Sequence, residues 1–202
     1  MGRRGPDGTY EGRGFRVSTS NLLAQLAEVA CEYLGVHEEP HGSNKGPKLR
    51  EFFTADDYQP PGPDEGYPWC ASFVCRCVQR FMALPAGKPF RNIIYPRTAR
   101  AFGLLTWGAN NGCLVAHPTP GSVYYRRDFR PQPGDIVVFE FSHCGIVAAQ
   151  AAKGRNFTAV EGNTNDDGSR EGYEVAARPR TWSDARAFIR LTPTPTLERT
   201  HA

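Results

Sequence analysis

The sequence predicts an α+β domain in which N-terminal helices pack on one antiparallel β-sheet. Apolar residues recur at helical spacing in the first half of the chain, and short β-rich runs fill the part after Gly134. The length of 202 residues is sufficient for one domain with its own hydrophobic core. We therefore assign the folded domain to residues 20–192 and interpret residues 1–19 and 193–202 as flexible tails.

The first predicted helix follows Ser20 or Asn21, either of which can cap its N-terminus. Its apolar residues would share one face: Leu22, Leu26, Val29, Ala30 and Tyr33. Gly35 is expected to end this helix as a C′ glycine. A short helix is expected around residues 48–53, before a loop over residues 54–68 that holds four prolines and two glycines.

The second long helix is predicted to begin near Trp69 and to end at Pro85. The residues at helical spacing after Cys70 form an apolar stripe: Phe73, Val74, Cys77, Val78 and Phe81. A third helix is expected over Pro96–Trp107, because proline suits a first helical turn. Strands are expected at 135–141, 145–151, 157–162, 173–179 and 187–191.

The composition is that of a soluble globular protein, with 40% hydrophobic residues and a net charge of +3. The mild positive charge would assist approach to an anionic cell wall or a nucleic acid without distinguishing them. No dense Lys/Arg block carries interleaved aromatics, so no nucleic-acid partner is expected. Arg3 and Arg4 precede no apolar stretch, so we expect a chain made in the cytoplasm without a Sec signal and without a membrane span.

Six cysteines would allow three disulfides, but in the cytoplasm we expect reduced thiols, at least five of them small core residues. Cys75 and Cys77 are too close for a zinc pair. The acidic residues before Cys70 lack the alternating spacing of a calcium loop: Asp56, Asp57, Asp64 and Glu65. We therefore expect no metal and no organic cofactor.

Cys70 lies in the first turn of the predicted second helix, directly after the turn-rich loop. A helical cysteine is most often a buried core residue, and Cys70 shares the face of the apolar stripe. In the first turn, however, unpaired backbone N–H groups and the positive end of the helix dipole favour a thiolate. The same N–H groups can bind an oxyanion, so this position favours a nucleophile.

A cysteine nucleophile needs a base, and the histidines available are His37, His41, His117, His143 and His201. His143 lies between two predicted strands, where a hairpin could bring its imidazole to the sulfur. Spacing alone does not separate it from a structural histidine. Glu161 and Asn163 would share a face and orient the imidazole if their strand continues, although a plain turn is the alternative interpretation.

Three blocks, YPWCASFV, PGDIVVFEFSHCGIV and AVEGN, together resemble the CHAP family of amidohydrolases and peptidases, relatives of the NlpC/P60 group. With the lead-in LGVHEEPHGSNKGPKLREFF, the similarity spans residues 22–192 and implies a papain-like fold. Two positions depart from the family pattern. Cys144 replaces an aliphatic residue, which we interpret as packing, and residues 122–131 look like an insertion that would border the cleft.

By this resemblance, Cys70 is the nucleophile and His143 the general base and acid. Glu161 orients His143, and Asn163 matches a fourth polar position. The resemblance implies cleavage of amide bonds in bacterial peptidoglycan through a thioester, as an N-acetylmuramoyl-L-alanine amidase or as an endopeptidase of the stem or cross-bridge. A cytoplasmic amidase acting on a small thiol- or polyamine-linked amide and an inactive wall-binding module stay open as alternatives.

The expected substrate contacts are Tyr67 and Trp69, which lie directly before the nucleophile. The expected partner is peptidoglycan, and the expected state is a monomer. Without a Sec signal, the enzyme would reach the cell wall or periplasm after lysis or secretion, as a phage endolysin or an antibacterial effector. An effector would also have an immunity protein or a delivery machinery as partner.

Overall fold

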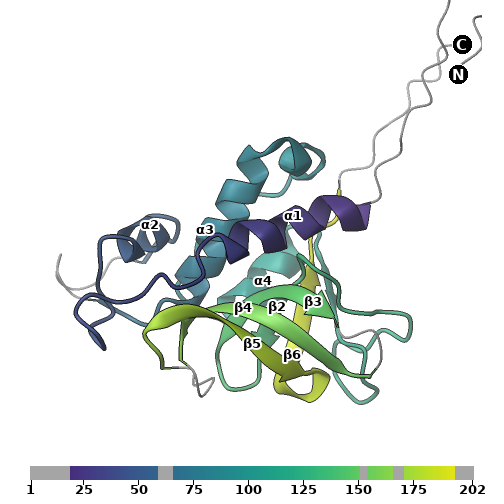
Figure 1. Cartoon of the computed structure of the whole chain (residues 1–202). Helices are drawn as coiled ribbons and strands as arrows, with labels where there is room; N and C mark the ends of the chain where they lie inside the picture. The colour runs from purple at the N-terminus through teal and green to yellow at the C-terminus, as the bar shows by residue number, and fades with distance from the viewer. Residues whose placement is uncertain (1–18, 59–65, 151–153, 166–170, 194–202) are drawn as a thin grey trace, which may run out of the picture.

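The computed structural model describes residues 19–58, 66–150, 154–165 and 171–193. Helices dominate the first half of these residues and strands the second half, which confirms the α+β class (Figure 1). The expected tails, residues 1–19 and 193–202, lie outside the described residues except for Thr19 and Pro193.

The sheet contains six strands among the described residues: β1 (Leu114–Ala116), β2 (Ile136–Phe139), β3 (Cys144–Gln150), β4 (Asn156–Thr164), β5 (Glu174–Thr181) and β6 (Ala185–Arg190). Their order is β1-β6-β2-β3-β4-β5, and every pair of neighbours is antiparallel. Five of the strands correspond to the predicted β-rich runs. β1 was not predicted, because three residues are too few to show an alternating pattern.

The helices of the described residues are α1 (Thr19–Cys31), α2 (Leu49–Phe53), α3 (Cys70–Ala83) and α4 (Gly103–Asn110), with 3₁₀ helices η1 (Pro85–Phe90) and η2 (Trp182–Asp184). α1 and α3 cover one face of the sheet, and α2 lies beside the start of α3 (Figure 1). The apolar stripe predicted for the second helix is fully buried on α3. Pro85 follows the helix end, as predicted.

Two hydrophobic clusters fill the two faces of the sheet. The larger lies between the helices and the sheet and includes Phe73 of α3, Ile146 of β3 and Val160 of β4. The smaller lies on the opposite face and includes Phe139 and Phe157. Because both faces are covered, β2 is buried along its whole length. Cys144 at the start of β3 contacts Cys70 at the start of α3, so the end of the sheet where β2 turns into β3 lies beside the N-terminus of α3.

The third helix begins later than predicted, at Gly103 instead of Pro96. The side chain of Thr98 explains the difference, since its Oγ1 accepts the N–H of Arg100 at 3.1 Å and holds a turn. The carbonyl oxygen of Thr98 also accepts the thiol of Cys75 at 3.4 Å. This segment is thereby tied to α3 in a non-helical conformation.

The first helix also differs from the prediction at both ends. It begins at Thr19, so Ser20 and Asn21 lie inside it and do not occupy the N-cap position. It ends at Cys31, and a turn follows to Gly35, which adopts a φ of 81°. The N–H of Gly35 donates to the carbonyl oxygen of Val175 at 2.9 Å, so a bond to β5 replaces the expected helix-capping bond.

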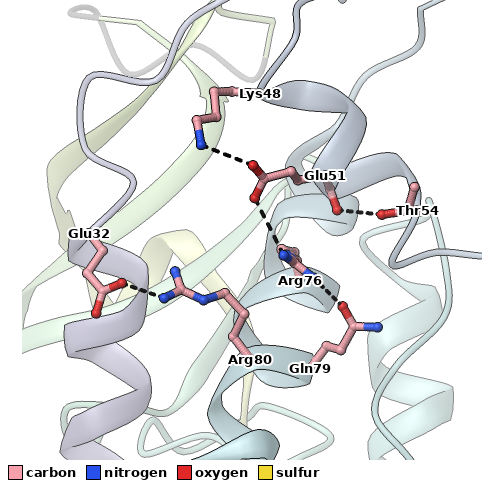
Figure 2. A network of polar contacts seen from close by, with 7 residues as sticks. All are labelled: Glu32, Lys48, Glu51, Thr54, Arg76, Gln79 and Arg80. Atoms are coloured by element: carbon pink, nitrogen blue, oxygen red, sulfur yellow. Dashed lines mark hydrogen bonds and ion pairs between the residues drawn. The ribbon is translucent and has the colours of Figure 1, made fainter.

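The solvent-facing sides of the helices are joined by ion pairs and hydrogen bonds (Figure 2). Glu51 of α2 contacts Lys48 at 3.0 Å and Arg76 of α3 at 3.5 Å, while Arg80 of α3 contacts Glu32 at 2.7 Å. Exposed pairs of this kind contribute about 0–1 kcal/mol each. The stripe of α3 is fully buried, so its packing is expected to contribute more to stability than these pairs do.

Candidate active site

Cys70 is the first residue of α3, where backbone N–H groups have no partner within the helix. Trp69 occupies the N-cap position, and its carbonyl oxygen accepts the N–H of Phe73 at 2.9 Å. No side chain caps this end of the helix. The side chain of Cys70 is 5% exposed. A carbonyl oxygen that gains negative charge beside the sulfur could therefore accept hydrogen bonds from the first turn.

Trp69 fixes the chain directly before the nucleophile. Its side chain is fully buried and stacks on Phe52, with ring centroids 5.5 Å apart. Its Nε1 donates to Oε1 of Glu38 at 3.0 Å, and Oε2 of Glu38 accepts the N–H of Asn44 at 2.9 Å. The expected substrate contact by Trp69 is therefore corrected, because this side chain packs in the core and presents no surface to a ligand.

Tyr67 is held by a second buried carboxylate. Its hydroxyl donates to Asp56, at 3.1 Å from Oδ1 and 3.0 Å from Oδ2. Burial, together with the charge of Asp56, raises the pKa of Tyr67 above its ordinary value. The side chain is 9% exposed, and substrate contact by Tyr67 stays a prediction.

His143 lies directly before β3, in the turn that joins β2 to β3. The N–H of Phe139 donates to its carbonyl oxygen at 2.9 Å, and Ser142 turns the chain with a φ of 61°. The imidazole is fully buried. Its ring stacks on those of Phe139 and Phe141, with centroids 6.0 Å away in each case. The hairpin expected around His143 is therefore present.

Strand register brings Glu161 of β4 to His143. Glu161 pairs with Gly145 of β3, and a Cβ at that glycine would lie 2.7 Å from Cγ of Glu161. Only glycine leaves room for the carboxylate side chain. Oε2 of Glu161 lies 3.1 Å from Nε2 of His143. Neither ring nitrogen of His143 meets full hydrogen-bond geometry within the described residues, but Nε2 is the nitrogen beside the carboxylate, so we assign Nδ1 to the sulfur of Cys70.

Two neighbours favour the thiolate of Cys70. The thiol of Cys144 donates a hydrogen bond to it, and the charge and hydrogen bond of His143 add to this effect. Together they outweigh burial and hold the pKa of Cys70 well below that of an ordinary thiol. Cys70 is therefore ionised under conditions in which an ordinary thiol is protonated.

The pKa of His143 is raised to about 9. Burial acts against the charged imidazolium, but the negative charge and hydrogen bond of Cys70, followed by those of Glu161, outweigh it. The two pKa shifts thus agree in direction, because each favours a thiolate at Cys70 and an imidazolium at His143.

Cys144 is buried, as expected for a packing residue, and it also acts on the pKa of Cys70. It is buried beside Cys70, and burial raises its pKa well above the ordinary value, so it remains a protonated donor. All six cysteines are free. The expectation that five would be core residues is wrong for Cys31, which is exposed, and for Cys113, which is half-buried.

Asn163 is fully buried near the end of β4, but the strand is irregular there. The register with β5 shifts between Glu161 and Thr164, and Asn163 adopts a φ of 57°. Simple two-residue alternation therefore does not place Asn163 on the face of Glu161. Its role as a fourth polar residue stays a prediction.

The insertion-like segment 122–131 borders a cavity of about 400 Å³. Ser122 and Val123 line it together with Glu140 and Arg186, and Glu140 belongs to the turn that carries His143. The segment thus lies near the β2–β3 turn, and its expected place at the border of the substrate cleft stays a prediction.

The acidic residues before Cys70 already have protein partners where they are described. Asp56 binds Tyr67, and Asp57 lies 2.8 Å from Nε of Arg97, while Asp64 and Glu65 lie outside the described residues. In the described ranges, no group of three or more His, Cys, Asp or Glu side chains could hold a metal ion. None of the described helices is long and apolar enough to cross a bilayer.

Arg180 of β5 also belongs to the site, although it was not predicted from the sequence. Its Nε donates to Oε1 of Glu161 at 2.8 Å and its Nη2 to Oε2 at 2.7 Å. The sequence offered one sign of it: Arg178 and Arg180 are two residues apart and therefore share a face of a half-buried strand. The sequence could not identify Glu161 as its partner, because Arg180 pairs in register with Phe157.

Comparison with protein families gives one match, to the CHAP domain, over residues 62–163. This range contains Cys70, His143 and Glu161 and covers half of the chain. Comparisons with curated proteins and with solved structures gave no significant match.

Proposed function

The chain belongs to the CHAP domain family, and on this premise we propose that it is a cysteine hydrolase of bacterial peptidoglycan. CHAP domains are generally amidases or peptidases. In this proposal Cys70 is the nucleophile and His143 is the acid and base. Glu161 orients the imidazole. The bond cleaved is the lactoyl–L-alanine amide or a peptide bond of the stem or cross-bridge.

The observation that carries the proposal is the position of Cys70 in the first turn of α3, where buried His143 lowers its pKa and itself lies 3.1 Å from Glu161. A buried thiol is normally protonated and unreactive. The four other buried or half-buried cysteines follow this rule, since burial raises the pKa of each: Cys75, Cys77, Cys113 and Cys144. The pKa of Cys70 is instead lowered, although this thiol is also buried. Cys70 lies at the N-terminus of a helix and beside a histidine, which is where a cysteine nucleophile is activated.

The first half of the reaction transfers the acyl group to the enzyme. The thiolate of Cys70 attacks the amide carbon, a C–S bond forms, and the oxygen gains negative charge. N–H groups of the first turn of α3 stabilise this oxyanion, and each such donor is worth about 10²–10³ in kcat. The C–N bond then breaks as the imidazolium of His143 gives its proton to the leaving amine.

The second half releases the acyl group. Neutral His143 takes a proton from water, whose oxygen attacks the thioester carbon. The C–S bond breaks, the product leaves as a carboxylic acid that gives its proton to solvent, and Cys70 and His143 return to the thiolate and imidazolium. Glu161 keeps Nε2 facing away from the sulfur in both steps, so Nδ1 carries the transferred proton.

The test is digestion of purified sacculi followed by mass spectrometry of the released fragments. The wild type is expected to clear the suspension, and the fragments identify the bond by their new termini. Cys70→Ala is the control and should release nothing. Intact sacculi after treatment with the folded wild type would contradict the proposal. Cleavage of a small amide by the same protein would then support the cytoplasmic amidase.

A further inference from the structure

The carboxylate of Glu161 is held from two sides in a site that excludes water. Arg180 binds both of its oxygens, at 2.8 and 2.7 Å, while Nε2 of His143 lies 3.1 Å from Oε2. The side chains of Glu161 and His143 are fully buried, and that of Arg180 is 13% exposed. Oε2 is therefore shared between the guanidinium and the imidazole.

Burial makes this arrangement costly unless the charges balance. An isolated carboxylate loses its hydration when it is buried, and a protein tolerates this only when the charge is paired. His143 alone cannot serve as the constant partner of Glu161, because it gives up its proton during the reaction. Arg180 keeps its charge at every step, since a guanidinium is not deprotonated in proteins.

The rest of the surroundings fix the guanidinium in place. Its Cζ lies 5.0 Å from the ring centroid of Phe139 and 5.3 Å from that of Phe141. These two rings also stack on His143. Aromatic faces attract a cation, and a planar fork bound to two oxygens has one orientation. Arg180 thus restricts both the charge and the direction of the carboxylate.

We propose that Arg180 is a positioning residue of the active site, which holds the Glu161 carboxylate toward His143 and balances its charge while the imidazole gains and loses its proton. The buried charges then alternate along one row: Cys70 negative, His143 positive, Glu161 negative and Arg180 positive. Among the other groups that bear on this row are Cys144, which donates to Cys70, and Asp184, whose charge acts on Arg180.

Without Arg180, the negative charge of Glu161 would act on the row uncompensated. The thiolate of Cys70 would be disfavoured, so less of it would be present at mildly acidic pH. The carboxylate would also lose its fixed direction, and a catalytic group displaced by about 1 Å can cost on the order of 10²-fold in rate. Lysine would restore the charge without the two-oxygen fork.

The experiment compares Arg180→Met, Arg180→Lys and the matched control Arg186→Met. Arg186 lies on β6 and pairs with exposed Glu140 at 2.9 Å. The first readout needs no substrate: the rate of Cys70 alkylation by iodoacetamide against pH, resolved by peptide mass spectrometry. At mildly acidic pH we expect Cys70 to be alkylated about tenfold more slowly in Arg180→Met than in the wild type. The reason is that the buried charge of Glu161 is then uncompensated. Arg180→Lys should restore most of the rate, and Arg186→Met should match the wild type.

The second readout is kcat on the substrate of the wild type, and it rests on the proposed function. Arg180→Met should lower kcat about 10- to 100-fold, and Arg180→Lys should recover it only in part. In a Glu161→Gln background, Arg180→Met should change kcat less than about twofold, because residues that act as a unit are not additive. That double variant removes both charges and also serves if the single variant unfolds.

Two results would overturn the role of Arg180. The first is a rate of Cys70 alkylation in Arg180→Met that equals the wild-type rate across the pH range. The second is a loss of kcat on Arg180→Met that is equally large in the wild-type and Glu161→Gln backgrounds. Failure of the wild type to cleave sacculi would overturn only the peptidoglycan proposal, because the alkylation comparison still decides whether Arg180 supports the thiolate.

Discussion

His117 and His143 are both buried near the sheet, but their surroundings differ. His117 is 4% exposed, and both ring nitrogens bind the backbone. Its Nδ1 accepts the N–H of Thr119 at 3.1 Å, so Nε2 carries the proton and donates to the carbonyl oxygen of Trp182 at 3.0 Å. These bonds fix one neutral tautomer, and His117 joins the segment after β1 to the turn before β6.

His143 instead faces groups that can change charge. Nε2 faces the carboxylate of Glu161, and Nδ1 is assigned to the thiolate of Cys70. The comparison shows that burial does not distinguish a structural histidine from a reactive one. The partners do, because backbone groups fix a tautomer whereas a thiolate and a carboxylate stabilise a proton that can be transferred.

The largest expected effect is that of His143→Ala. Without an acid and base, turnover should fall on the order of 10⁵-fold or more, by analogy with loss of a histidine in other hydrolases. Hydrolysis of sacculi or of a released fragment measures this loss. Residual activity within about tenfold of the wild type in a folded His143→Ala variant would show that another residue serves as the base.

The pH dependence of the wild type comes next in size. His143 must hold a proton for the leaving amine, and its pKa is about 9. Activity should therefore be retained below this value and fall about tenfold per pH unit above it. The rate of hydrolysis between pH 5 and pH 10.5, at roughly constant ionic strength, measures this limb. A limb centred near the ordinary histidine pKa of about 6.5 would contradict the ion pair.

A smaller effect is expected for Cys144→Val. The substitution removes the thiol that donates to Cys70, and hydrogen bonds to charged groups contribute about 1.5–3 kcal/mol. The pKa of Cys70 should rise, and its alkylation at mildly acidic pH should slow about tenfold or more. Cys77→Val is the matched control, because Cys77 is equally buried but does not act on Cys70. Equal rates in the two variants would assign Cys144 to packing alone.

The smallest effect on chemistry is expected for His117→Ala. Loss of the ring leaves two backbone groups without their partner and should lower the free energy of unfolding by about 1–3 kcal/mol. Urea denaturation measures this change. kcat should remain within about twofold of the wild type. A loss of kcat as large as that of His143→Ala would remove the distinction between the two histidines.

The helical half of the site was predictable from local sequence. The apolar stripe after Cys70, together with Pro85, predicted the helix, and the place of Cys70 in its first turn favoured this residue as a nucleophile. The sheet half was predictable only in outline. His143 and Glu161 were selected by family resemblance, because antiparallel register joins residues that are distant in sequence. Arg180 shows the limit, since its side chain reaches a residue that is not its partner in register.

Trp69 shows a different limit. Its place next to Cys70 suggested contact with substrate, but Glu38 and Phe52 bind it from within the core. These contacts depend on how α2 and the segment after α1 pack against α3. Position beside a nucleophile therefore does not distinguish a residue that binds substrate from one that anchors the loop.

The most direct test of the central claim is competition among the six cysteines for limiting iodoacetamide at mildly acidic pH. Cys31 is exposed, but burial of its sulfur, followed by the charge of Glu28, raises its pKa. Cys70 is buried, but its thiolate is stabilised. We predict that Cys70 is labelled first and that His143→Ala abolishes this preference. Labelling of Cys31 or Cys113 before Cys70 in the folded wild type would contradict the assignment of Cys70 as the nucleophile.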